Sequence, residues 1–362
     1  MKLHEKNIVS REEAENMLDI VSGVFMENMN WDYISVVENK ESEACFFDVG
    51  VYDFDIEKEY IKKNHPINEM IDIINVNEDN REITFEIPLV QNLMQYSLKY
   101  MAEKDSTKEK KISLKLSEVS CKPKTTINNN IVHNTRVVLA RKGGYDIKNI
   151  CRSGQGTLGG VVVDKNDNRY VVTNNHVIDN GPNTIENEDK IASPSRKVNG
   201  SEYNIIGTVF WRLEDDKHDI ALVKVHEKHK VTGGVRCFNI SSKKISTRKL
   251  KCGEQIKICG IISPPEKNSS TIKSTKCTKR RLRGENRIFK CLIQTHESMS
   301  EEGDSGSFVF DDSNHVVGLL IKDFNGSDHS YFMSLDILTK EIQTGDLNFF
   351  PIIGLYFFSK NI

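Results

Sequence analysis

Hydrophobic and polar residues follow different patterns before and after about residue 131. In the first part several segments repeat apolar residues at helical spacing, whereas later the apolar residues form short runs between turn residues. Residues 10–29 give the clearest helical pattern. Ser10 and Glu13 have the spacing of a capping box. After them, apolar residues recur at helical spacing and would lie on one face of a helix: Ala14, Met17, Leu18, Val21, Val24 and Phe25. The pattern predicts an amphipathic helix.

The rest of the first part mixes both periods. Residues 45–56 and 81–87 alternate as strands do, whereas Ile67, Met70, Ile71 and Ile74 give residues 65–76 a helical register. Residues 88–104 open with a proline and are also predicted to be helical. We therefore expect a small α+β domain over residues 1–102. Its helices either build its core or bind a partner, and core building is the interpretation that we favour.

Two further segments have their own composition. Residues 103–130 are charged, polar and poor in large apolar residues, which predicts a linker. Residues 346–362 form an apolar tail that contains "FFPIIGLYFF", too short to cross a bilayer and interrupted by Pro and Gly. We expect no membrane span, and we expect the tail to pack against a domain surface.

From residue 131 to 345 the pattern is that of β-structure. Short apolar runs such as "GTLGGVVV", "RYVVTNN", "DIALVKV" and "HVVGLLI" recur between turn signals, without long helical patterns. Such a series is typical of an all-β sandwich or barrel. The segment 268–287 is different because it carries a basic run, "KRRLR". We predict a solvated surface loop there, and a nuclear-import signal or a site for an anionic partner is the alternative.

Composition limits the function. The chain of 362 residues is 38% hydrophobic and 28% charged, with a formal net charge of −2. A near-neutral balance argues against bulk nucleic-acid binding as the main role. The first residues lack the apolar core of a secretory signal. A cytoplasmic protein is therefore expected, with a nuclear location as the alternative.

The eight cysteines are scattered and form no CxxC pair. A zinc site is therefore not expected, and the sequence indicates neither another metal nor a cofactor. We expect free and mostly buried thiols, as in a reducing compartment.

Three short stretches carry residues that could perform chemistry together. His176 follows a strand in "TNNHV", Asp219 directly precedes the apolar run "IALVKV", and Ser305 lies in "GDSGS". A serine hydroxyl becomes a nucleophile when an imidazole takes its proton, and a buried carboxylate orients that imidazole. Backbone N–H groups must then stabilise the oxyanion, and a glycine such as Gly303 permits a close approach.

In these three stretches the sequence resembles the trypsin-like, chymotrypsin-fold serine protease superfamily, over residues 135–345. "TNNHV" is similar to the high-temperature-requirement stress proteases, and "GDSGS" is closer to the trypsin branch. The resemblance implies a chymotrypsin-like double six-stranded β-barrel and a serine endopeptidase that forms an acyl-enzyme with protein or peptide substrates. It assigns His176, Asp219 and Ser305 to a triad, and the N–H groups of Gly303 and Ser305 to the oxyanion hole. The domain at 1–102 would then recruit substrates or sense a signal.

Departures from the family are also informative. Val177 and Glu301 stand where secreted relatives carry disulfide cysteines, and no "IVGG"-type start precedes the barrel. We therefore expect the Asp304 carboxylate to cap local N–H groups rather than a newly cut N-terminus.

The resemblance also places residues around the primary specificity pocket. It puts Met299 at the base of the pocket, and Ile321 and Asp323 in its wall. A methionine floor favours an apolar or medium-sized residue before the scissile bond. His218 and His296 are interpreted as incidental neighbours of the site.

A second interpretation belongs to a different functional class. The barrels of a catalytically silent pseudoprotease would serve as a protein-binding module driven by the first domain. Whether Ser305 reacts as a nucleophile distinguishes the endopeptidase from the pseudoprotease.

Overall fold

The computed structural model divides the chain into two compact units, and each is described by itself. The first unit comprises Met1–Lys122 and Lys273–Gln294, and the second comprises Pro123–Ile272 and Thr295–Ile362. The structure describes residues 9–25, 31–38, 45–51, 54–63, 72–77, 82–88, 111–118, 140–151, 155–163, 168–179, 189–198, 202–235, 248–262, 268–281, 287–321 and 328–334. The apolar tail at 346–362 lies outside these residues.

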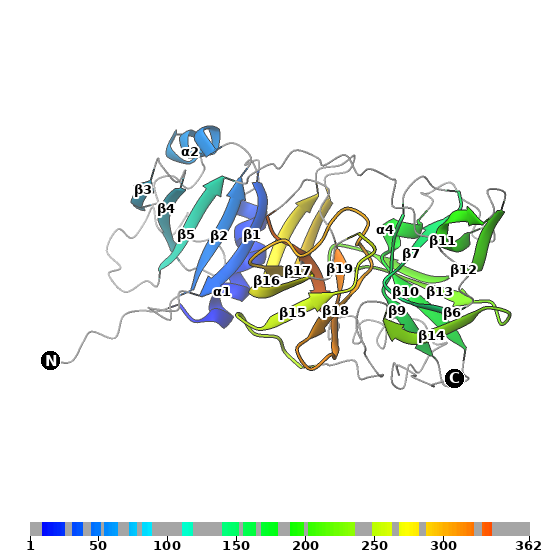
Figure 1. The fold of residues 1–362 in the computed structure, drawn as a ribbon. Helices are drawn as coiled ribbons and strands as arrows, with labels where there is room; N and C mark the ends of the chain where they lie inside the picture. The colour runs from blue at the N-terminus through cyan, green and yellow to red at the C-terminus, as the bar shows by residue number, and fades with distance from the viewer. Residues whose placement is uncertain are drawn as a thin grey trace. The chain divides into compact units, whose positions relative to one another are not determined.

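The first unit is a mixed sheet with two α-helices and a short π-helix. Its elements are α1 (Arg11–Ile20), η1 (Val21–Phe25), β1 (Trp31–Glu38), β2 (Cys45–Val51), α2 (Phe54–Lys63), β3 (Asp72–Asn77), β4 (Glu82–Pro88), β5 (Lys111–Glu118) and most of β16 (Ser269–Arg281) and β17 (Arg287–Thr295). The strand order is β16-β1-β2-β5-β4-β3 (Figure 1). The β2–β5 pair is parallel, and the other pairs given by their registers are antiparallel. A small α+β unit is therefore present, as expected.

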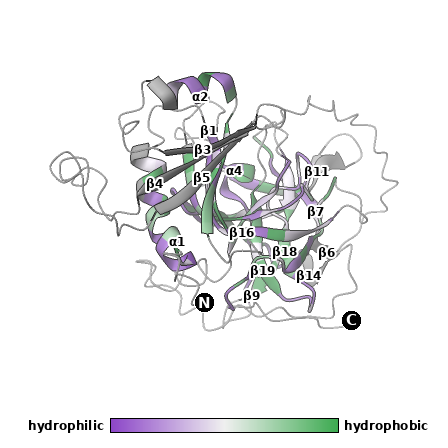
Figure 2. Ribbon diagram, turned by 90° about the vertical axis from the view of Figure 1, so that its left-hand side faces the viewer, coloured by the Kyte–Doolittle hydropathy of each residue, from purple (hydrophilic) through white to green (hydrophobic). Residues whose placement is uncertain are grey.

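Helix α1 begins where the capping box predicts. The Ser10 side chain accepts a hydrogen bond from the Glu13 N–H group, and the Glu13 carboxylate accepts one from the Ser10 N–H group at 2.8 Å. Ala14, Met17 and Leu18 are buried in a core with strands β1 and β2. Figure 2 shows hydrophilic and hydrophobic residues alternating along α1. The helix prediction is confirmed up to Ile20, and the chain continues as η1.

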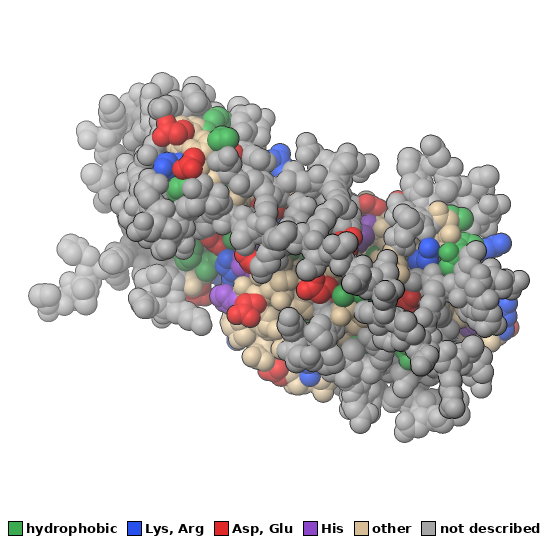
Figure 3. All heavy atoms as spheres, turned by 45° about the horizontal axis from the view of Figure 1, so that its top comes forward, with side chains coloured by type: hydrophobic (Ala, Val, Ile, Leu, Met, Phe, Trp, Pro, Cys, Tyr) green, Lys and Arg blue, Asp and Glu red, His purple; other side chains and the backbone are tan. Residues whose placement is uncertain are grey.

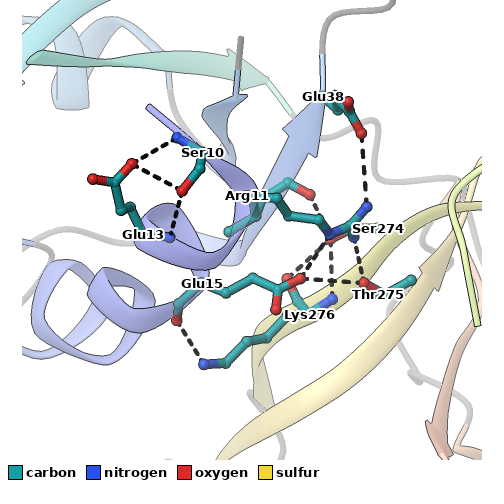
Figure 4. A network of polar contacts seen from close by, with 9 residues as sticks. Ser10, Arg11, Glu13, Glu15, Glu38, Ser274, Thr275 and Lys276 are labelled. Carbon is teal, nitrogen blue, oxygen red and sulfur yellow. Dashed lines mark hydrogen bonds and ion pairs between the residues drawn. The ribbon is translucent and has the colours of Figure 1, made fainter. Parts of the chain in front are cut away.

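Polar contacts also tie α1 to strand β16 (Figure 4). Arg11 Nε lies 2.8 Å from Glu15 Oε1, and Lys276 Nζ donates to the Glu15 carbonyl oxygen at 2.6 Å. The Thr275 hydroxyl lies 3.3 Å from the same Glu15 carboxylate. One glutamate therefore connects the helix to the strand through both its side chain and its backbone.

Some predicted elements of the first unit differ in the structure. The strand-like segment 45–56 ends at Val51, and helix α2 begins at Phe54. The helix predicted over 65–76 is wrong from residue 72 onward because β3 pairs with β4 there. β-Branched residues dominate this short apolar run, and pairing with a neighbouring strand decides such ambiguous segments. Of the helix predicted at 88–104, Pro88 is described, as the last residue of β4, and the rest lies outside the described residues.

The segment expected to be a linker contributes a strand to the sheet. Within residues 103–130, β5 lies between β2 and β4 and pairs with both along its length. The sequence "KISLKLS" at the start of β5 alternates between polar and apolar residues, which is the pattern of a half-buried strand. The high charge of the surrounding residues hid this alternation.

The basic run is not a surface loop over the residues that form β16. Lys279 is 4% exposed and forms an ion pair with Asp32, which is 1% exposed. Lys273 Nζ lies 2.6 Å from Asp48 Oδ2, which also accepts a hydrogen bond from the Tyr33 hydroxyl. Acidic residues of β1 and β2 therefore neutralise lysines of β16. Burial of a charge is tolerated when it is paired in this way.

We expect Lys279→Met to lower the free energy of unfolding by about 3–5 kcal/mol because the Asp32 carboxylate would stay buried without its partner. The double variant Asp32→Leu/Lys279→Met buries no charge and should recover most of this loss. Urea denaturation of both variants measures the effect. The exposed Lys251→Met is the control, and an equally small loss in Lys279→Met and Lys251→Met would contradict the prediction.

The second unit contains a seven-stranded sheet that is nearly closed into a barrel. It comprises β7 (Tyr145–Asn149), β8 (Gly156–Leu158), β9 (Gly160–Val163), β10 (Arg169–Thr173), β11 (Lys190–Val198), β12 (Glu202–Glu214) and β13 (Asp219–Val225). The strand order β8-β7-β11-β12-β13-β10-β9 places β8 and β9 at the two edges. Gly159 alone joins these edge strands, and its N–H group donates to the Val172 carbonyl oxygen at 2.9 Å. The sheet therefore curls until its edges nearly meet. Beside it, β6 (Ala140–Gly143) pairs with β14 (Lys230–Val235).

A second set of six strands closes completely. It comprises β15 (Gln255–Ile258), β18 (Phe308–Asp311), β19 (Val316–Ile321), β20 (Tyr331–Ser334), β17 (Arg287–Thr295) and β16. These strands follow one another in this order, and β15 also pairs with β16, which closes the ring. The expected chymotrypsin-like double barrel is confirmed, with seven strands rather than six in the first barrel.

The cysteines differ in part from the expectation. Cys45, Cys151, Cys252, Cys277 and Cys291 are free, but Cys151 is exposed. Cys259 is disulfide-bonded, and its partner lies outside the described residues. The expectation of free thiols is therefore wrong for Cys259.

The described surface carries charges of both signs. Figure 3 shows acidic and basic side chains interspersed on the face that it presents. Among the described residues, no helix has the length and apolar character needed to cross a bilayer.

A tight turn between β18 and β19 rests on the Asp311 carboxylate. Its Oδ1 atom accepts a hydrogen bond from the His315 N–H group at 2.8 Å, and its Oδ2 atom accepts one from Arg248 at 3.2 Å. Asn314 has a φ of 61°, the left-handed conformation that asparagine tolerates in turns. Burial alone would raise the pKa of the Asp311 carboxyl, but the hydrogen bonds from His315 and Arg248 outweigh it and lower this pKa.

A depressed pKa makes the Asp311 contribution to stability dependent on pH. The contribution is complete above the unfolded pKa of about 3.9 and is lost as the pH falls through the lower folded value. At pH 7 we expect Asp311→Asn to be less stable than the wild type by about 1 kcal/mol. The difference should shrink as the pH falls below about 4. Urea denaturation from pH 7 to pH 3 tests this, and a difference independent of pH would contradict it.

Candidate active site

His176 lies on a single helical turn after strand β10. Helix α4 (Asn175–Ile178) follows the N-cap residue Asn174, and Val177 and Ile178 anchor the turn in the core of the first barrel. The apolar pair fixes the turn, so the histidine between Asn175 and Val177 keeps a defined direction and is partly exposed.

Asp219 is the first residue of β13 and is completely buried. Its Oδ2 atom lies 2.5 Å from His176 Nδ1, and its Oδ1 atom accepts a hydrogen bond from the His176 backbone N–H group at 2.9 Å. One carboxylate therefore holds both the ring and the backbone of the same histidine. The imidazole presents its Nδ1 side to Asp219, which leaves Nε2 as the nitrogen for another partner.

Two further contacts hold the backbone of Asp219. The Asn174 side-chain amide donates to the Asp219 carbonyl oxygen at 2.7 Å, and the Asp219 N–H group lies 3.2 Å from the Met333 sulfur atom. Sequence patterns do not reveal these two supporting residues. The only signal for Asn174 is its place in "TNNHV", and Met333 carries no motif.

Ser305 lies in a tight loop between Met299 and β18 and is 5% exposed. Gly303 has a φ of 106° and Gly306 a φ of 91°, conformations that L side chains rarely adopt. The Gly306 N–H group donates to the Leu320 carbonyl oxygen at 3.1 Å, and the Leu320 N–H group donates to the Ser307 carbonyl oxygen at 2.9 Å. Strand β19 therefore holds the loop directly after the serine.

The first barrel contacts the Ser305 loop through Gly156 and Thr157 of strand β8. The Thr157 N–H group donates to the Ser305 carbonyl oxygen at 2.7 Å, and the Thr157 hydroxyl donates to the Gly303 carbonyl oxygen at 2.9 Å. A Cβ atom on Gly156 would lie 2.5 Å from the Val177 side chain and 2.9 Å from the Ser305 carbonyl oxygen. Gly156 thus lies between Val177, the residue after His176, and the backbone of Ser305. The structure brings His176 and Asp219 into contact, and the assignment of Ser305 to the same triad stays a prediction.

The Asp304 side chain holds the loop that contains Ser305 through hydrogen bonds to backbone N–H groups. Its fully buried carboxylate accepts hydrogen bonds from the Ile262 N–H group at 2.9 Å and from the Glu301 N–H group at 2.8 Å. Gly260 makes room for it because a Cβ atom there would lie 2.1 Å from Asp304 Oδ1. The capping role expected for Asp304 is therefore present in the structure.

The backbone of the loop leaves two N–H groups available. The Asp304 N–H group donates to the Glu301 carbonyl oxygen at 2.9 Å. In the described part of the chain the N–H groups of Gly303 and Ser305, on either side of it, donate to no partner. Their role in an oxyanion hole stays a prediction.

The residues expected around the specificity pocket are buried. Met299 is 1% exposed, and its N–H group donates to the Ser330 hydroxyl at 3.0 Å. Ile321 is 6% exposed and pairs with Tyr331 across β19 and β20. Asp323 lies outside the described residues. The roles of these residues in substrate binding stay predictions.

We expect Asp304→Ala to lower the free energy of unfolding by about 3 kcal/mol because two N–H groups lose a charged acceptor, at about 1.5 kcal/mol each. Urea denaturation measures the change. The exposed Asp312→Ala is the matched control and should shift stability by less than about 0.5 kcal/mol. Similar values for the two variants would show that the carboxylate does not hold the loop.

Residues 156–319 match the family model of the trypsin-like peptidase domain. A search of curated proteins found no match. Similarity to the high-temperature-requirement proteases stays a prediction.

Three solved proteases are among the structures similar to this chain. A glutamic acid specific serine protease, described as using a histidine triad in substrate binding, is 18% identical, with a TM-score of 0.42 over 55% of this chain and 96% of that chain. Protease A of Thermobifida fusca is 18% identical, with a TM-score of 0.41 over 56% of this chain and 96% of that chain. Alpha-lytic protease homolog N4 is 10% identical, with a TM-score of 0.43 over 56% and 97%. The family-model match shows that residues 156–319, less than half of the chain, are similar to the trypsin-like peptidase domain.

Proposed function

We propose that this protein is a serine endopeptidase that uses His176, Asp219 and Ser305 as its triad. One observation carries the proposal. The Asp219 carboxylate is fully buried and bonds to both Nδ1 and the backbone N–H group of His176. A buried carboxylate in this arrangement fixes the tautomer of the imidazole and stabilises the imidazolium ion that forms during acyl transfer.

In the proposed mechanism His176 Nε2 takes the proton of the Ser305 hydroxyl as the serine oxygen attacks a peptide carbonyl carbon. The contact between Ser305 and His176 is part of the proposal. The resulting imidazolium ion then protonates the leaving amine, and the acyl-enzyme remains on Ser305. His176 next activates a water molecule, which hydrolyses the ester and frees the serine.

The oxyanion of each tetrahedral intermediate would bind the N–H groups of Gly303 and Ser305. Two features support this assignment, since the N–H groups have no other partner among the described residues and Asp304 holds the loop between them. Preorganised donors of this kind are typically worth on the order of a hundredfold in turnover each.

The substrate side chain before the scissile bond is proposed to be apolar or medium-sized. The support is Met299, which is buried beside the serine loop and places a thioether rather than a charge there. An apolar site does not compensate a buried substrate cation.

A fluorophosphonate probe tests the proposal without a known substrate. The purified full-length chain should be labelled at Ser305, and the label should be absent in Ser305→Ala. In His176→Ala the labelling rate should fall by about a hundredfold or more because the serine loses its base. Intact-mass spectrometry follows the reaction, and Ser313→Ala, a change of an exposed serine, is the matched control.

A folded wild type that stays unlabelled would refute the enzyme and favour the protein-binding pseudoprotease. Labelling that persists in Ser305→Ala would show that another group reacts.

A further inference from the structure

The loop directly before Asp219 contains a second histidine–aspartate pair. Strand β12 ends at Glu214, which pairs with Asp219 at the start of β13. Residues 215–218 connect the two strands. Within this loop His218 Nδ1 lies 2.8 Å from Asp215 Oδ1 and 2.9 Å from Asp215 Oδ2. The sequence pattern suggested that His218 is incidental, but the structure gives it a defined partner.

The Asp215 carboxylate also holds the backbone of the loop. Its Oδ1 atom accepts hydrogen bonds from the Lys217 N–H group at 2.8 Å and from the His218 N–H group at 2.7 Å. The Asp215 N–H group in turn donates to the His218 carbonyl oxygen at 3.0 Å. Residues 215 and 218 are therefore joined through both their backbones and their side chains.

His218 and Asp215 differ in burial. His218 is 1% exposed, whereas the Asp215 side chain is 43% exposed. A buried imidazole requires a partner for its N–H group, and the Asp215 carboxylate, three residues earlier, is such a partner. Burial would raise the pKa of the Asp215 carboxyl, but the hydrogen bonds from His218 and Lys217 outweigh burial and lower it. The ionised form of Asp215 is therefore the one that the loop favours.

The loop of residues 215–218 leads directly into Asp219, so the loop can affect the position of Asp219 through the backbone. Asn174 holds its carbonyl oxygen, and Met333 faces its N–H group, which belongs to the peptide unit shared with His218. If residue 218 moved, this peptide unit would turn and the carboxylate would shift relative to His176. A displacement of about 1 Å in such a group can reduce a rate by about a hundredfold.

We propose that Asp215 and His218 are positioning residues that hold Asp219 in register with His176. The inference rests on the proposed function of the triad. Neither residue touches the reacting atoms, and both act through the backbone of Asp219. A merely stabilising pair would change the melting temperature but leave the tautomer of His176 unaltered.

Histidine tautomers give a readout that does not depend on catalysis. In full-length protein labelled with ¹⁵N-histidine, NMR shows which ring nitrogen of His176 carries the proton, and His176→Gln assigns its signals. We expect the proton on Nδ1 in the wild type because that nitrogen faces Asp219. In Asp215→Ala and His218→Phe we expect a mixture containing the Nε2–H form, together with an about tenfold slower reaction with the fluorophosphonate probe.

Two variants sharpen the test. Asp215→Asn keeps an oxygen acceptor for the two backbone N–H groups, so it should restore most of the Nδ1–H tautomer that Asp215→Ala loses. Asp216→Ala removes an exposed carboxylate from the same loop and should behave as the wild type. If His218→Phe does not fold, the Asp215 variants decide the question because that side chain is partly exposed.

The outcomes separate the two proposals. An unreactive wild type whose Nδ1–H tautomer is still lost in Asp215→Ala would refute the protease but support the positioning role. An unchanged tautomer in Asp215→Ala would overturn the positioning role, whether or not Ser305 reacts. A wild type already in the Nε2–H form, or an equal effect of Asp216→Ala, would overturn it too.

Discussion

The close approach of the backbone at Gly156 and Thr157 to the Ser305 loop is the contact on which the candidate site depends. Thr157 binds the carbonyl oxygens of Ser305 and Gly303, and a Cβ atom on Gly156 would collide with Val177 and with Ser305. The histidine and the aspartate belong to one barrel, and the serine belongs to the other. Because a peptide group approaches another more closely than side chains do, glycines bring the two halves of the site within reach.

Each half is then supported by a buried carboxylate. Asp219 organises His176, and Asp304 organises the backbone around Ser305. Both are completely buried, where an unpaired charge would be strongly unfavourable. The same burial that makes these carboxylates costly makes their hydrogen bonds to His176 and to the Ser305 loop stronger than they would be in water.

The first unit uses buried charge differently. Lys279 and Lys273 of β16 pair with Asp32 and Asp48, which belong to strands far away in the sequence. Such pairs contribute little net stability compared with apolar residues of the same size, but they penalise any other strand register. A sheet with one apolar face against α1 and ion pairs among its strands can therefore fix which segment of β16 lies beside β1.

Local motifs were predictable because neighbouring residues contain their chemistry. The capping box of α1, the alternation of β4 and the strand runs of the barrels depend on residues a few positions apart. The order of His176, Asp219 and Ser305 was also visible, because each lies in a short motif beside a strand. Burial was harder to predict. Lys279 looked like part of a solvated loop, and its partner Asp32 is 247 positions away.

The sequence by itself determined the class of the fold and the three residues on which the proposed chemistry depends. The tertiary structure decided which polar residues support them: Asn174, Met333 and the Asp215–His218 pair around Asp219, and Gly260 under Asp304. The physical reason is that a supporting contact requires a shape and a partner at one point in space. Strand pairing and barrel closure, rather than any local pattern, bring those groups together.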